Sequence, residues 1–65
     1  MKTYKFEVRS TRGGFLEWAV ALEDGKEVRR IDRDVGAETV RAFRERVGSA
    51  LEAEGFRPAD GQYSL

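Results

Sequence analysis

The sequence predicts an α+β domain in which three antiparallel strands precede one C-terminal helix, in the order β-β-β-α, with the helix packed on one face of the sheet. Three observations lead to this prediction. Apolar and charged residues alternate in the first third of the chain, an Asp-Gly pair separates two strand-like segments, and apolar residues recur at helical spacing between Ala37 and Glu54. With 65 residues, the chain has room for a single domain, 1–65, in which residues 55–65 form a tail.

The first strand is expected over residues 4–9, where apolar side chains alternate with charged ones. This period of two is typical of a strand with one buried and one solvated face. The buried face would carry Tyr4, Phe6 and Val8. A loop should follow over Ser10-Thr11-Arg12-Gly13-Gly14, because paired glycines accept positive φ and small polar residues favour turns.

The second strand is expected over residues 15–23 and offers two different faces to the helix. One face carries the larger apolar residues Leu16, Trp18, Val20 and Leu22. The other face carries Phe15, Ala19 and Ala21 between glutamates. We assign the larger residues to the core and expect the face with the alanines to remain open.

A hairpin turn is expected at Asp24-Gly25, because Asp-Gly between strand-like residues is a strong turn signal. A two-residue turn and a three-residue loop are both compatible with this pair. The three-residue loop is preferred because it keeps Val28 on the same face as Trp18. Since Ile31 is then out of phase with Val28, the third strand should bulge or end near Arg30.

The helix is expected over residues 37–54, with Asp34 as its N-cap, because a carboxylate there can accept a bond from an amide of the first turn. Gly48 inside it is either tolerated at the edge of the buried stripe or a point of close approach by another backbone. Gly55 should end the helix, with Phe56 folding back on the last turn. The tail beyond could be a fourth, edge strand, a docked segment or disordered. The predicted core consists of Tyr4, Phe6, Val8, Leu16, Trp18, Val20, Leu22, Val28, Val40, Phe43, Val47 and Leu51.

The composition excludes several kinds of chemistry. The chain contains no cysteine and no histidine, which removes disulfides, thiol nucleophiles, the commonest metal ligands and the usual general base. Three acids at the helix entry, Asp32, Asp34 and Glu38, are expected to be solvated and to complement the helix dipole. We therefore expect no catalysis, no cofactor, no metal and no small-molecule substrate.

The chain is also expected to be cytoplasmic and to make no contact with membranes. Its longest apolar run, Trp18 to Leu22, is far shorter than the roughly 20 residues that cross a bilayer. Its first residues alternate charged and aromatic side chains and lack the apolar segment of a signal peptide. Basic and acidic residues number 12 each, so the formal net charge is zero.

Nucleic-acid binding is the alternative function that the sequence leaves open. Most of the basic residues are arginine, whose guanidinium forks onto phosphates and guanine edges. Residues 1–33 carry 8 basic and 6 acidic side chains, so the sheet half is mildly basic, although its glutamates interrupt the pattern. The candidate contacts are Arg9, Arg12, Arg29, Arg30 and Arg33.

Two resemblances to known families concern this first half of the chain. Trp18, Gly25-Lys26 and the following helix resemble the arm-binding domains at the N-termini of some tyrosine integrases, which implies a sheet face that enters a DNA major groove. Residues 6–28, in particular Trp18-Ala19-Val20, resemble the YegP-like small proteins, whose subunits pair. The Gly-aromatic segment that this second family places before its helix is absent here. Both are treated as shared architecture, and no functional residue is carried over.

Protein contact is the function that the sequence favours. A chain of this size buries only about 60% of the surface that its unfolded form exposes, and without disulfides or metal it gains most from association. The partner would be a second copy of the chain, or a larger protein for which this domain is an adaptor or inhibitor. An edge strand could also pair with a neighbour through backbone bonds. The candidate contacts are Phe15, Ala19 and Ala21 on the open face, with Arg29 and Arg30 at its rim.

Overall fold

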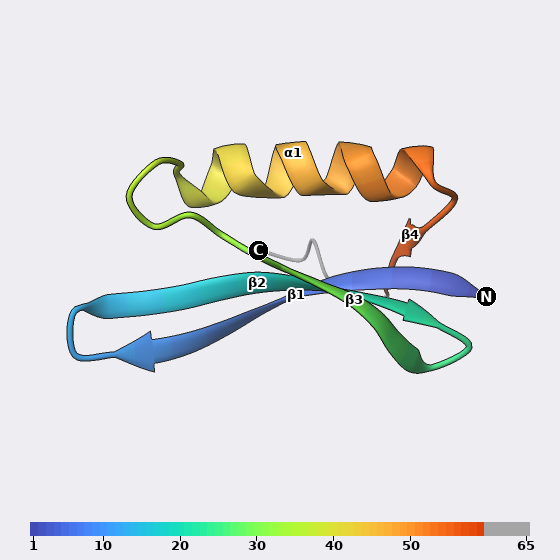
Figure 1. Ribbon diagram of the computed structural model, residues 1–65, viewed down its shortest axis with the longest axis horizontal. Coiled ribbons are helices and arrows are strands. Elements are labelled where there is room, and N and C mark those ends of the chain that lie inside the picture. Colours follow the sequence, from blue (N-terminus) through green and yellow to red (C-terminus); the bar gives the residue numbers. More distant parts are fainter. Residues whose placement is uncertain (60–65) are drawn as a thin grey trace.

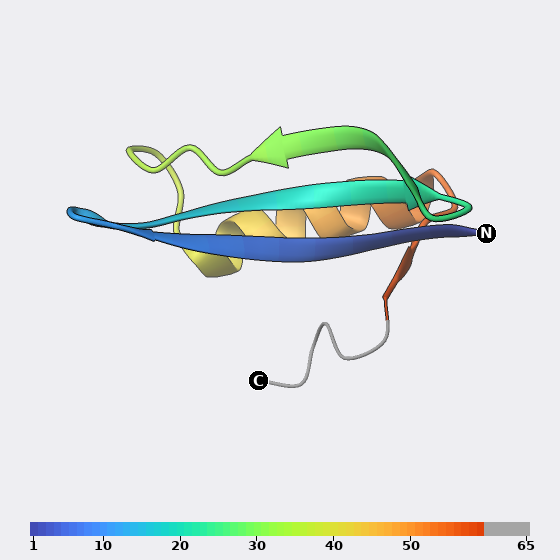
Figure 2. The ribbon, with the colours of Figure 1, turned by 90° about the horizontal axis from the view of Figure 1, so that it is seen from below.

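The predicted α+β class is confirmed by the computed structural model, which describes residues 1–59. The elements in chain order are β1 (Lys2–Thr11), β2 (Gly14–Glu23), β3 (Lys26–Asp32), α1 (Val40–Ala53) and β4 (Arg57–Pro58). The strands form one sheet in the order β3-β2-β1-β4, with β4 parallel to β1 and the other neighbours antiparallel. Figure 1 shows α1 lying over one face of this sheet, and Figure 2 views the sheet from the side away from α1.

Both hairpins turn through two residues, Arg12-Gly13 and Asp24-Gly25. The predicted loop over residues 10–14 is therefore too long, and the predicted three-residue loop at Asp24-Gly25 is wrong. Asp24 has φ 52° and Gly25 has φ 83°, the left-handed pair that matches the twist of a hairpin. The turn pairs Glu23 with Lys26. The register then shifts between Ala21 and Leu22, which makes Val28 the extra residue of a bulge. The bulge expected near Arg30 therefore lies two residues earlier.

The β1–β2 register overturns the predicted assignment of faces. A two-residue turn pairs even-numbered residues of β1 with odd-numbered residues of β2, and Tyr4 lies opposite Ala21 while Phe6 lies opposite Ala19. Directly opposite residues share a face, so the alanines, each 1% exposed, belong to the core beneath α1. The core cluster comprises Tyr4, Ala19, Ala21, Phe43, Val47, Leu51 and Phe56, with Phe6 and Ile31 packed against it.

The larger apolar residues of β2, predicted to face the helix, lie on the opposite face: Leu16, Trp18, Val20 and Leu22. Two further predicted core residues are also exposed, Val8 at 57% and Val28 at 53%. Small side chains under α1 explain the arrangement physically. They allow the helix backbone to approach the sheet, so that Phe43 and Leu51 fill the space above β2.

The helix starts later than predicted and has a different cap. Thr39 is the N-cap, and its Oγ1 accepts a hydrogen bond from the Ala42 amide at 3.1 Å. Asp34, the predicted cap, instead closes the preceding turn by accepting a bond from the Gly36 amide. The predicted end is confirmed, since Gly55 has φ 94° and the amide of Phe56 donates to the Leu51 carbonyl at 3.0 Å.

A fourth strand is present, which was one of the predicted alternatives for the tail. It places Arg57 beside Thr3 and Pro58 beside Tyr4, and the Ala59 amide donates to the Tyr4 carbonyl at 2.9 Å. These bonds bring the chain back from the end of α1 to the outer side of β1 (Figure 1). The rest of the predicted tail, 60–65, lies outside the described residues.

The covered alanines lead to a first prediction. Ala21→Leu should lower the free energy of unfolding by about 1–3 kcal/mol, because the added atoms would separate α1 from β2. The same substitution at the exposed helix residue Ala50 should change it by no more than about 0.5 kcal/mol. Urea unfolding followed by circular dichroism measures both values. Equal stability of the wild type and the Ala21 variant would contradict this assignment of faces.

Candidate functional site

The sheet face opposite α1 is not covered by any element within residues 1–59, and we call it the open face (Figures 1 and 2). Its centre is an apolar stripe along β2, made of Leu16, Trp18, Val20 and Leu22. Charged residues flank the stripe on both sides. They are Lys5, Glu7 and Arg9 on β1, and Glu27, Arg30 and Asp32 on β3.

The apolar stripe is buried at its centre and exposed to solvent towards its ends. Val20 is only 2% exposed, whereas Leu16 is 46% exposed and Leu22 is half-buried. Trp18 is half-buried beneath the Arg30 guanidinium, whose carbon lies 4.5 Å from the centroid of the indole ring. This cation–π contact leaves a polar group over the largest apolar side chain of the face. The open face is therefore amphipathic and suits a partner that is itself part apolar and part charged.

The strand register arranges the open face in rows that run across the strands. One row consists of Lys5, Val20 and Arg30, and is basic at both ends. The next row consists of Glu7, Trp18 and Asp32, and is acidic at both ends. Within the chain, Lys5 Nζ lies 3.4 Å from Glu7 Oε1, and Arg30 Nε lies 3.0 Å from Asp32 Oδ1. Basic and acidic side chains thus alternate along both borders of the apolar stripe.

Of the five residues predicted to contact a protein partner, only Arg30 lies on the open face. Ala19 and Ala21 are buried under α1, so their prediction as contacts is wrong. Phe15 is 43% exposed on the helix side, where the Arg33 guanidinium carbon lies 5.5 Å from the centre of its ring. A sequence signal for the correct face did exist. A two-residue turn between β1 and β2 pairs even-numbered with odd-numbered residues, and this pairing places Leu16, Trp18 and Leu22 on the open face.

Arg29 also lies on the helix side, where it binds α1. Its two terminal nitrogens donate to both carboxylate oxygens of Glu54 at 2.8 and 2.7 Å. This bidentate bond raises the pKa of Arg29 and lowers the pKa of Glu54. Arg29 thus serves to hold the last turn of the helix against β3.

The five candidate contacts to nucleic acid do not form one surface. Arg9 and Arg30 lie on the open face, and Arg12 lies in the turn between β1 and β2. Arg29 is bound to Glu54, while Arg33 donates to the Glu38 carbonyl at 2.9 Å, both on the helix side. A groove-binding sheet face would therefore have at most three of the five arginines.

The carboxylate of Glu17 is buried beneath α1 and fully engaged. Its two oxygens accept bonds from Nε and a terminal nitrogen of Arg44 at 3.2 and 3.1 Å. The Arg44 guanidinium carbon also lies 5.5 Å from the centre of the Phe6 ring. A charge with 2% exposure needs such a partner, because an unpaired buried carboxylate is costly. Glu17 and Arg44 form a structural tie between β2 and the helix.

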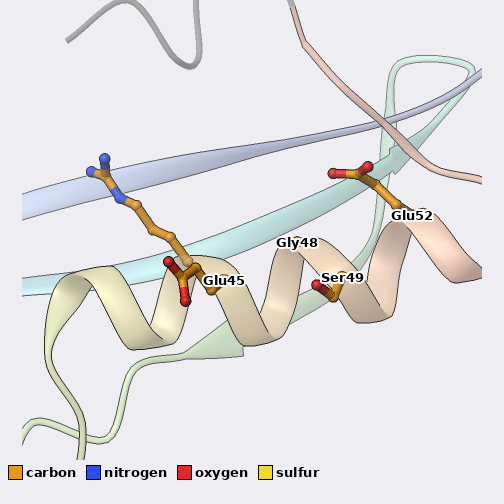
Figure 3. A pocket seen from close by; sticks show the side chains of 5 residues that line it. Glu45, Gly48, Ser49 and Glu52 are labelled. Carbon is orange, nitrogen blue, oxygen red and sulfur yellow. The ribbon is translucent and has the colours of Figure 1, made fainter.

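A shallow depression of about 370 Å³ runs along α1 and is lined by Arg44, Glu45, Gly48, Ser49 and Glu52. Figure 3 shows Glu52 directed towards the strands, where its carboxylate accepts a bond from the Tyr4 hydroxyl. With Arg44 bound to Glu17, two of the three charged residues of this depression are used in holding the fold. Within the described part of the chain, no group of three or more acidic side chains is placed to hold a metal ion.

Comparisons with protein-family models, curated proteins and solved structures give no match to this chain. The resemblances to integrase arm-binding domains and to the YegP-like proteins therefore stay likenesses of architecture. Among residues 1–59, α1 has 14 residues, and no helix combines the length and apolar character that crossing a bilayer requires.

The Arg29–Glu54 bond leads to a second prediction, on pH dependence. Because the folded-state pKa of Glu54 is lowered from 4.5, the bond contributes stability above about pH 4.5 and loses it as the pH falls through the folded-state value. Glu54→Gln should therefore reduce stability near neutral pH, with the difference from the wild type shrinking in acid. Urea unfolding between pH 2 and 7 measures this difference. In an Arg29→Met background, Glu54→Gln should have a smaller effect near neutral pH, and an unchanged effect would contradict the prediction.

Proposed function

We propose that this protein is a non-catalytic protein-contact domain that binds its partner through the open face. The observation that carries the proposal is the position of the apolar stripe on a face that no described element covers. Leu16 is 46% exposed there, and Trp18 and Leu22 are half-buried. Exposed apolar surface rimmed by polar residues is typical of interaction sites, and here the accessible apolar area lies on either side of the buried Val20.

The distribution of side-chain volume along β2 supports this proposal. The strand places alanines against its own helix and its largest apolar residue, Trp18, on the opposite face. A sheet with apolar residues on both faces gains stability from a layer on each side, and α1 supplies only one of them. A partner would supply the second layer in a chain with no cysteine for disulfides.

The charges on the open face favour a protein over a nucleic acid. Three basic side chains, Lys5, Arg9 and Arg30, are matched by three acidic ones, Glu7, Glu27 and Asp32. A phosphate backbone would be repelled by the acidic members, whereas a protein surface can match both signs. Action in the cytoplasm remains part of the proposal, in keeping with the cysteine-free composition.

Polar substitution of the apolar stripe tests the proposed function. The variant Leu16→Asn/Leu22→Asn should lose association with any protein partner, because both side chains offer accessible apolar area on the open face. The control Val35→Asn changes an exposed residue of the loop before α1 and should bind as the wild type does. Self-association is measured by light scattering, and binding of other proteins by retention from an extract of the native cell.

Two results would contradict this proposal. One is a wild type that neither associates with itself nor retains any protein. The other is retention that is equal for the wild type and the Leu16/Leu22 variant. Circular dichroism of the three proteins checks that a loss of binding does not come from unfolding.

Nucleic-acid binding has its own test. In titrations with duplex DNA and single-stranded RNA, the wild type and Arg9→Ala/Arg30→Ala should show the same weak affinity and the same salt dependence. The reason is that the acidic residues of the open face oppose phosphate contacts there. Fluorescence anisotropy at low and high salt measures both quantities. A strong affinity in the wild type that falls in the double variant, with a shallower salt slope, would instead support the nucleic-acid alternative.

A further inference from the structure

We propose that the partner of the open face is a second copy of this chain, packed face to face in an antiparallel, two-fold dimer. The inference rests on the proposed function and adds to it the identity and orientation of the partner. The two-fold axis would lie between the sheets and run across the strands, midway between the row of Val20 and the row of Trp18. The charge pattern of those two rows carries the argument.

A rotation about this axis lays each row of one subunit over the other row of the second subunit. The basic row of Lys5, Val20 and Arg30 then faces the acidic row of the partner. Lys5 faces Glu7 of the partner subunit, and Arg30 faces Asp32 of the partner subunit. Two-fold symmetry repeats each pairing, so four contacts of opposite charge surround the centre of the interface.

The same rotation matches the apolar residues. Trp18 lies over the row of the partner's Val20, whose side chain is itself only 2% exposed, so the accessible apolar area comes from Trp18 and from the two ends of the stripe. Leu16 faces the partner's Leu22, and these are residues at the two accessible ends of the stripe. Side chains of packed sheets interdigitate at a spacing of about 10 Å, which favours pairing of large with small residues.

The other face-to-face arrangement has its axis along the strands and is disfavoured by the same charges. It would place β1 over the partner's β3 at the same level. Lys5 would then face Arg30 of the partner subunit, and Glu7 would face Asp32 of the partner subunit, giving four contacts of like charge. The pattern of the open face therefore selects the antiparallel arrangement.

The size of the open face sets the expected strength of the dimer. Residues 16–22 extend over about 20 Å of strand, and the interface is at the small end of those that proteins use, below about 1,200 Å² in total. Such an interface associates weakly, so the dimer should be measured at chain concentrations that reach the millimolar range. Sedimentation equilibrium gives its dissociation constant.

Charge reversal on β1 tests both the partner and the orientation. Lys5→Glu alone and Glu7→Lys alone should each weaken the dimer about tenfold, because like charges would meet across the two-fold axis. An equimolar mixture of the two variants should associate about as tightly as the wild type. In the mixture, the acidic positions 5 and 7 of one subunit face the basic positions 5 and 7 of the other.

A second pair of variants controls for net charge. Arg41 and Glu45 form an exposed pair on α1, away from the open face. Arg41→Glu and Glu45→Arg change the net charge by the same amounts, and each should dimerise as the wild type does. Their mixture should not differ from either variant alone. An effect of this control as large as that of the β1 variants would overturn the proposal.

The remaining outcomes each have one meaning. A wild type that stays monomeric at every concentration overturns the second copy as partner. It leaves the proposed function standing only if a protein from the native extract binds the wild type and not the Leu16/Leu22 variant. A mixture of the two β1 variants that stays monomeric overturns the antiparallel arrangement. A Lys5→Glu dimer that is tighter than the wild type also overturns it, because position 5 faces Arg30 of the partner subunit only in the other arrangement.

Discussion

The pairing of β1 with β2 decides which surface of this protein is core and which is open. Because the turn at Arg12-Gly13 has two residues, Tyr4 and Phe6 share a face with Ala19 and Ala21. A change of one residue in this turn would move the whole set of β2 side chains to the other face. The position of the helix, the composition of the core and the exposure of Trp18 all depend on this register.

Polar contacts then fix the helix over the alanines. Arg44 binds the buried Glu17 near the middle of the chain's longest hairpin, while Glu52 accepts from the Tyr4 hydroxyl and Glu54 from Arg29 near the end of α1. Each contact joins the helix to a different strand. The small side chains beneath α1 contribute little apolar area to the core. Packing alone would therefore fix the position of α1 less strictly than packing together with these three polar contacts.

The sequence was sufficient to predict the strands and the helix, but not to predict which face of the sheet the helix covers. Period-two alternation, Asp24-Gly25 and the Gly55 end of the helix are local signals, and the structure follows them. Which face of β2 is buried is a long-range property, since Ala19 is covered by residues from α1 more than twenty positions away. The assumption that larger apolar residues are buried first then gave the wrong face, and with it the wrong contacts.

We propose association through the face rather than through an edge of the sheet, and the structure of the two edges supports this choice. The outer strand β3 carries a bulge at Val28 and charged residues around it, and both features oppose pairing with a neighbouring strand. At the other side, β4 occupies the edge of β1 beside Thr3 and Tyr4. The open face has neither obstacle. In the proposed dimer, its rows of alternating charge would favour one orientation of the partner over the other.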